Sequence, residues 1–248
     1  MQFIYNILFE ACFIVSAPYY FLRMRRRGGW RKGFGERLGR YSTKYKQALS
    51  NRDLFWLHAV SVGEVNLCVQ IIKALQPRLP NIKLVVSTTT TTGMSVLHKK
   101  LPAKVGKIYY PMDRRGYVRR AFATIRPKAV VLVEAEIWPN FLWGLQARDI
   151  PHFLVNTRIS GKSYDGYRRF RFLFRRFFAG FAGVGAQSEH DAKRLVELGC
   201  DSEMVHVFGS CKFDGTGISR DRLLDVSSLL RSLGVPKGAP LLVGGSTH

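Results

Sequence analysis

Four charged side chains follow directly after hydrophobic runs of this sequence, at positions where they could take part in chemistry. They are Glu64, Glu134, Glu136 and Lys212. If the hydrophobic runs are parallel strands of an α/β domain, all four side chains lie at the edge of the sheet where ligands bind. A carboxylate at such an edge can act as a general base, because it can accept the proton of a hydroxyl group.

Glu64 has two interpretations. The sequence Ser61-Val-Gly-Glu64 matches a capping box, in which Ser61 is the N-cap of a helix and Glu64 is its third residue. The helix dipole stabilises a carboxylate in the first turn whether or not that carboxylate reacts. The same dipole favours the ionised form that a general base requires. A structural cap and a general base therefore both remain open for Glu64.

Glu134 and Glu136 follow residues 129–133, a nearly continuous apolar run that is typical of a central parallel strand. Two carboxylates beside a buried strand are costly unless they are paired or hydrated. We expect them at the same edge of the sheet as Glu64, and this placement favours a functional role.

The elements that must position these residues alternate between strands and helices, which predicts an α/β fold with a parallel sheet. Strands are predicted over residues 54–60, 82–86, 107–110, 129–133, 152–155, 183–186 and 205–208. Helices are predicted over residues 65–75, 94–100, 117–125, 192–198 and 220–233. The threonine-rich turn at residues 87–93 either holds a phosphate at a helix start or serves only as an N-cap.

Residues 167–181 are rich in phenylalanine and arginine. Phe170, Phe174, Phe177, Phe178 and Phe181 recur with the spacing of one helical face. Stacking platforms for nucleic-acid bases need exposed aromatic rings. The spacing therefore favours a core or membrane-facing helix with a basic rim.

The composition indicates a globular protein with an anionic partner. The chain has 248 residues, 46% of them hydrophobic, enough for one large domain or one domain and part of another. Its 39 Lys and Arg against 17 Asp and Glu give a net charge of +22. This charge suits nucleic acid, a phosphorylated substrate or an acidic membrane. The four scattered cysteines lack metal-ligand spacing, which indicates reduced thiols in a cytosolic compartment.

Residues 3–22 form an apolar segment, which is interrupted by Asn6 and Glu10. A cluster of arginines follows the segment. If the segment crosses a membrane, the arginines place the rest of the protein in the cytoplasm. A mid-helix charge costs about 2.5–3.5 kcal/mol on insertion. Spanning the membrane and lying on its surface therefore both remain open, and either way the segment acts as an anchor.

Eight short motifs occur in order along the chain. They are Gly35-Glu-Arg-Leu-Gly39, His58-Ala-Val-Ser-Val-Gly-Glu64, Thr89 to Gly93, Glu134-Ala-Glu-Ile-Trp-Pro-Asn140, Asn156-Thr-Arg-Ile-Ser160, Gln187-Ser-Glu-His-Asp191, Gly209-Ser-Cys-Lys-Phe-Asp214 and Ser246-Thr-His248. Together they resemble the 3-deoxy-D-manno-octulosonic acid (Kdo) transferases of lipid A biosynthesis. Ala135, Thr157 and Ile159 depart from the usual family residues, and none of these departures removes a proposed catalytic group.

The resemblance implies a GT-B glycosyltransferase, with two Rossmann-like domains and an N-terminal membrane-associated helix. It implies inverting, metal-independent transfer of Kdo from CMP-Kdo to a lipid A precursor in lipopolysaccharide biosynthesis. No cofactor is expected besides CMP-Kdo as the donor substrate. The expected partners are the acceptor lipid, an anionic membrane surface and CMP-Kdo bound through the C-terminal domain, with no nucleic acid. The expected location is the cytoplasmic face of the cell inner membrane.

By the same resemblance, Glu64 matches the general base, while Glu134 and Lys212 match residues assigned to transition-state stabilisation. The residues expected to bind substrate are Ser61, Gly63, Thr90, Glu136 and Arg158. No metal ligand is expected.

The expected organisation has three parts. Residues 1–27 are the anchor helix and basic cluster, and residues 28–217 are the acceptor-side Rossmann-like domain. Residues 218–248 comprise a linker helix and the first strand, at 241–243, of a truncated donor-binding domain. One alternative is a non-catalytic half that binds only the acceptor lipid and the membrane. A weaker alternative, a basic nucleic-acid-binding protein, is disfavoured by the order of the motifs and by the buried spacing of the phenylalanines.

Overall fold

The computed structural model describes residues 2–26, 31, 33–43, 45, 47, 54–211, 225–236 and 238–240. The chain divides into two compact units, Met1–Lys212 and Phe213–His248. In the second unit the helix α11 (Val226–Ser232) is capped by Asp225, whose carboxylate accepts a hydrogen bond from the Ser228 N–H at 3.0 Å. The expected strand at residues 241–243 lies outside the described residues.

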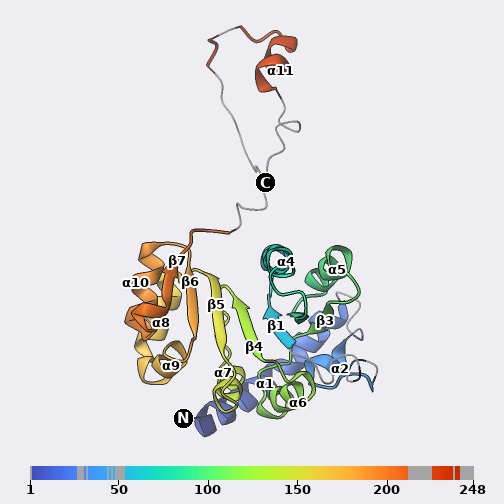
Figure 1. Cartoon of the computed structure of the whole chain (residues 1–248), viewed down its shortest axis with the longest axis vertical. Coiled ribbons are helices and arrows are strands. Elements are labelled where there is room, and N and C mark those ends of the chain that lie inside the picture. Colours follow the sequence, from blue (N-terminus) through green and yellow to red (C-terminus); the bar gives the residue numbers. More distant parts are fainter. Residues whose placement is uncertain are drawn as a thin grey trace. The chain divides into compact units, whose positions relative to one another are not determined.

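The first unit is built on a sheet of seven strands in the order β3-β2-β1-β4-β5-β6-β7 (Figure 1). All neighbouring strands are parallel. The strands are β1 (Leu54–His58), β2 (Lys83–Thr88), β3 (Gly106–Tyr109), β4 (Ala129–Val133), β5 (His152–Thr157), β6 (Gly183–Ala186) and β7 (Val205–Val207). The predicted parallel sheet is confirmed.

Helices cover both faces of the sheet. The helices α4 (Val62–Leu75) and α5 (Thr91–Lys100) pack on one face. The helices on the other face are α6 (Arg115–Ile125), α7 (Pro139–Gln146), α8 (Gly161–Arg169), α9 (Arg171–Phe178) and α10 (Glu189–Leu198). The direction of the strand order reverses between the neighbours β1 and β4. A reversal of this kind opens a crevice at the carboxyl ends of the strands, where ligands of such sheets bind.

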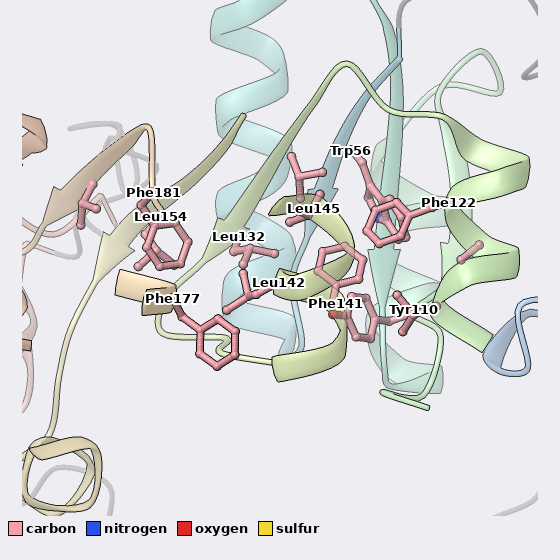
Figure 2. Packing of buried hydrophobic residues seen from close by; sticks show 14 of the residues in the cluster. Trp56, Tyr110, Phe122, Leu132, Phe141, Leu142, Leu145, Leu154, Phe177 and Phe181 are labelled. Atoms are coloured by element: carbon pink, nitrogen blue, oxygen red, sulfur yellow. The ribbon is translucent and has the colours of Figure 1, made fainter. Parts of the chain in front are cut away.

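Aromatic rings fill the core under α6 and α7 (Figure 2). Trp56 of β1 is fully buried, and its ring centroid lies 5.0 Å from that of Phe141 and 5.8 Å from that of Phe122. Its indole N–H donates a hydrogen bond to the Ser87 Oγ at 2.7 Å, which satisfies the only polar group of the ring. This packing fixes β1 and therefore the turn that follows it.

Residues 167–181 do not form one helix, so the prediction of a single helical face is wrong: Phe170 lies at the break between α8 and α9, and Phe181 lies after the end of α9. Phe170 separates α8 from α9 with φ −108° and ψ 34°, which interrupts the helical hydrogen bonds. Phe177 and Phe178 are fully buried, as the spacing predicts. Phe170 is 49% exposed because the break turns it away from the core.

The apolar N-terminal segment forms the helix α1 (Gln2–Arg26), which is long and apolar enough to cross a membrane. Two of its polar side chains, Asn6 and Glu10, face the rest of the unit. Asn6 accepts a hydrogen bond from Asn140, and Glu10 forms an ion pair with Arg114. Asn6 and Glu10, four residues apart, therefore share the face of α1 that meets the rest of the unit.

Candidate active site

Glu64 lies in the first turn of α4, directly after β1. The N-cap Ser61 accepts a hydrogen bond from the Glu64 N–H at 3.2 Å. The Glu64 carboxylate accepts hydrogen bonds from the N–H groups of Ser61 at 3.1 Å and Val60 at 2.8 Å. The predicted capping box is confirmed, and Gly63 lies exposed in the same turn. Since two carboxylate oxygens offer about four acceptor sites, the cap leaves capacity for a substrate hydroxyl.

Two threonines at the end of β2 and the start of α5 bind the turn between β1 and α4. Thr88 at the end of β2 and Thr90 each donate a hydroxyl hydrogen bond to the Val60 carbonyl at 3.3 Å. Thr90 is also the N-cap of α5, because its Oγ1 accepts the Gly93 N–H at 3.0 Å. The predicted N-cap is therefore present, and phosphate binding at this turn stays a prediction. Because the Val60 N–H binds Glu64, Thr90 also fixes the backbone that holds the Glu64 carboxylate.

Glu134 and Glu136 lie in the loop between β4 and α7, and both are half-buried. Glu134 has φ 62°, in the left-handed region that few residues other than glycine adopt. Its N–H donates a hydrogen bond to the Val155 carbonyl at 2.9 Å. The Glu136 carboxylate accepts the indole N–H of Trp138 at 2.8 Å. Backbone strain of the Glu134 kind is concentrated at functional sites.

The electrostatics of Glu136 link the three glutamates. Burial raises the pKa of Glu136 to about 7, the hydrogen bond from Trp138 opposes this shift, and the charges of Glu64 and Glu134 add to it. The structure thus brings Glu64, Glu134 and Glu136 together at the carboxyl ends of β1 and β4. A carboxyl group that titrates near neutral pH can accept and return a proton. Within the described part of the chain, no group of three or more His, Cys, Asp or Glu side chains is arranged to hold a metal ion.

Arg158 and Lys212 are the remaining residues predicted for this site. Arg158 follows β5 at the same edge of the sheet and is exposed. Lys212 lies outside the described residues, so its place at the site stays a prediction.

Asn156, the first residue of the Asn156-Thr-Arg-Ile-Ser160 motif, holds the backbone of Cys211, just before Lys212. It is 3% exposed and has φ 54°. Its side-chain Oδ1 accepts the Cys211 N–H at 3.1 Å, and its carbonyl accepts the Gln187 side-chain amide at 2.8 Å. Asparagine tolerates the left-handed region better than most residues. An asparagine at the end of a strand is therefore the signal that could have identified this position.

His58 lies beneath the site at the end of β1 and is fully buried. Its ring stacks on Tyr110 with centroids 3.8 Å apart, and its Nδ1 lies 2.9 Å from the Ser87 Oγ. Burial lowers the pKa of His58 to about 3, so the imidazole is neutral at physiological pH. His58 is therefore an uncharged, buried side chain that packs beneath the turn after β1.

The fold is a Rossmann-like α/β domain, and three glutamates lie at the topological switch point of its sheet. Residues 32–215 match the family model described as 3-deoxy-D-manno-octulosonic-acid transferase (kdotransferase). The chain belongs to this family of glycosyltransferases.

Curated relatives agree with this assignment. A 3-deoxy-D-manno-octulosonic acid transferase of Bordetella pertussis is 32% identical over 198 residues, which cover 77% of this chain and 45% of the relative. The transferase of the same name from Haemophilus influenzae is 28% identical over 219 residues, covering 84% of this chain and 51% of the relative. The chain spans about half the length of these two relatives.

Solved structures support the fold. The Staphylococcus aureus MnaA–UDP structure superposes with a TM-score of 0.52 at 15% identity, covering 73% of this chain and 51% of that chain. A putative UDP-N-acetylglucosamine 2-epimerase of Listeria monocytogenes gives 0.51 at 10% identity, covering 74% and 51%. At these identities the similarity concerns the fold alone. The expected N-terminal domain of the GT-B type is confirmed, and the chain corresponds to about half of such a molecule.

Proposed function

We propose that this chain is the acceptor-side half of an inverting, metal-independent transferase that moves Kdo from CMP-Kdo to a lipid A precursor. The observation that carries the proposal is the group of three glutamates at the switch point of the sheet, in a chain of the Kdo transferase family. Such a group supplies a proton acceptor where acceptor and donor sugars would meet. No cofactor is required, since the donor is already activated as a nucleotide sugar.

In the proposed reaction, a hydroxyl oxygen of the acceptor forms a bond to the anomeric carbon of Kdo. The bond from that carbon to CMP breaks, and CMP leaves with the electron pair. Glu64, in the first turn of α4, takes the hydroxyl proton. Lys212 stabilises developing negative charge, while Glu134 stabilises a developing oxocarbenium ion or positions Lys212.

Substrate contacts are proposed for the groups around Glu64. Ser61, Gly63 and Thr90 line the turns at the starts of α4 and α5. Glu136, with its pKa near 7, can donate as well as accept a hydrogen bond from a sugar hydroxyl. Arg158 is exposed at the same edge and can bind an anionic group of the acceptor.

The proposed location is the cytoplasmic face of the inner membrane, with α1 as the anchor. The acceptor is an anionic lipid, which fits both the apolar helix and the net charge of +22. CMP-Kdo is proposed to bind through the second half that the longer relatives have.

The test compares this chain with a protein in which it continues into that second half. Residues 1–248 should bind a lipid A precursor but transfer no Kdo, and the extended protein should transfer Kdo from CMP-Kdo in the presence of EDTA. An extended protein that is inactive, or that EDTA inactivates, would contradict the proposal.

A second candidate is a non-catalytic half that binds the acceptor lipid and the membrane only. The chain spans about half the length of the curated relatives from Haemophilus influenzae and Bordetella pertussis. Binding of the acceptor by residues 1–248, together with inactivity of every extended form, would support this candidate instead.

A further inference from the structure

Four arginines surround a cavity beside α1, on the helix layer formed by α6, α7 and α9. The cavity has a volume of about 670 Å³. Its basic residues are Arg115, Arg119, Arg148 and Arg176, and Gln2 of α1 also lines it. None of the described residues that line it is acidic. Glu64, Glu134 and Glu136 are not part of it, so it is separate from the proposed active site.

The positive charges of this cavity are not compensated within the described residues. No hydrogen bond or ion pair of the Arg115, Arg119 and Arg176 guanidinium groups is formed there. Arg148 donates only to the Gly144 carbonyl, at 2.9 Å, and lies over the Phe122 ring. Like charges around one cavity repel each other, and a bound anion relieves this repulsion. Guanidinium groups bind phosphate with two parallel hydrogen bonds, which makes phosphate the best-matched anion.

The helix next to the cavity presents an apolar surface outward. Its exposed side chains include Phe3, Ile4, Ile7, Leu8, Ile14 and Val15. The polar groups that would oppose insertion are turned to the protein, since the Tyr5 hydroxyl donates to Asp113 at 2.9 Å and Glu10 pairs with Arg114. The outward face of α1 is therefore suited to hydrocarbon.

A second element carries the same combination of apolar and basic side chains. Phe172 of α9 is 70% exposed and lies four residues before Arg176. Residues four apart share a helix face, so an exposed ring accompanies a cavity arginine. Aromatic and basic side chains together are typical of surfaces that meet the headgroup region of a membrane.

We propose that this cavity binds the phosphate headgroup of an anionic bilayer lipid in the membrane that α1 enters. The arginines bind the phosphate, and the apolar face of α1 lies beside the acyl chains. Nucleic acid would offer the same phosphate but no partner for the exposed side chains of α1. The site fixes how the catalytic unit sits on the membrane, a role beyond the proposed sugar transfer.

The test is a charge-conserving double substitution, Arg119→Lys with Arg176→Lys, in residues 1–248. Lysine keeps the positive charge but lacks the bidentate geometry of arginine. Flotation with vesicles of equal parts phosphatidylcholine and phosphatidylglycerol should show about tenfold weaker binding, from the loss of charge-assisted hydrogen bonds. The matched control, Arg40→Lys with Arg78→Lys, changes two exposed arginines outside the cavity and should bind like the unchanged chain.

Two competition arms separate the sources of phosphate. Inorganic phosphate should displace the unchanged chain from vesicles more strongly than sodium chloride of equal ionic strength. Equal vesicle binding by the cavity variant and the unchanged chain would overturn the proposal, even if inorganic phosphate still bound the cavity. The proposal would also be overturned if the cavity variant lost binding to a DNA duplex but kept its binding to vesicles. If far-UV circular dichroism shows that the double variant does not fold, the single variants Arg176→Lys and Arg40→Lys are compared for vesicle binding in the same way.

Discussion

Glu64 combines a structural and a proposed chemical task in one side chain. Its carboxylate accepts two backbone N–H groups, and its own N–H is capped by Ser61. These bonds orient the carboxylate at the start of α4. A substitution at Glu64 therefore has to be chosen so that the two tasks are separated.

Glu64→Gln makes that separation in the extended protein. The amide oxygen still accepts a backbone hydrogen bond, but the amide cannot take a proton from a hydroxyl group. We expect turnover to fall by about 10²–10⁴-fold with little change in acceptor binding. The control Ser61→Ala removes the cap and should lower the free energy of unfolding by about 1 kcal/mol. A Glu64→Gln protein that melts at lower temperature yet turns over normally would leave Glu64 with the capping role alone.

Glu136 predicts a pH dependence of stability. Burial, with the charges of Glu64 and Glu134, raises its pKa to about 7 in the folded state, whereas an unfolded chain has a glutamate pKa of about 4.3. The folded state then binds the proton more tightly, so stability falls as pH rises from about 4 to 7. Glu136→Gln should flatten the fall in melting temperature across this range. An unchanged slope in Glu136→Gln would show that Glu136 does not titrate there.

At the scale of elements, the loop between β3 and α6 joins three parts of the unit. Asp113 in this loop accepts the N–H groups of Asn140 at 3.0 Å and Phe141 at 2.9 Å, at the start of α7. It also accepts the Tyr5 hydroxyl of α1. The helix α7 therefore has a cap supplied by a distant loop, and this cap sits at the end of the loop that carries Glu134 and Glu136.

Asp113→Ala should destabilise the unit through α7. The substitution leaves two buried N–H groups without acceptors, at a cost of about 1–3 kcal/mol for each group. Chemical denaturation should record this loss, and hydrogen exchange should accelerate at the amides of Asn140 and Phe141. The control Asp165→Ala changes an exposed carboxylate on α8 and should leave both measurements unchanged. Equal exchange in the two variants would contradict the capping role of Asp113.

At the scale of the whole molecule, charge and hydrophobicity point to the same environment. The net charge is +22, and α1 is apolar on its outward side, with Arg23, Arg25 and Arg26 in its last turn. Basic residues beside an apolar helix are attracted to anionic leaflets, by about 1 kcal/mol for each charge.

Residues 1–27 should therefore account for much of the binding to anionic vesicles. Removing them should weaken flotation, and part of the binding of the unchanged chain should be lost at high salt, since surface charges are screened. Circular dichroism of the shortened chain is the control for folding. Flotation that does not change after the deletion would show that α1 is not the anchor.

The sequence by itself determined the elements and their caps. Alternation of apolar runs with helical spacing predicts the parallel sheet, and Ser61 with Glu64 marks the start of α4. These features depend on residues only a few positions apart, so they can be read without the fold. Motifs in order along the chain were enough to indicate the family.

Tertiary structure decided the properties that depend on residues far apart in the sequence. The pKa of Glu136 depends on burial and on Glu64, and Asp113 caps a helix that begins 26 residues later, at Pro139. The partner of Glu10 is Arg114. The break at Phe170 turned one predicted core ring to the surface. Burial and electrostatic coupling arise only when such distant segments pack together. The spacing of residues along the sequence carries no information about that packing.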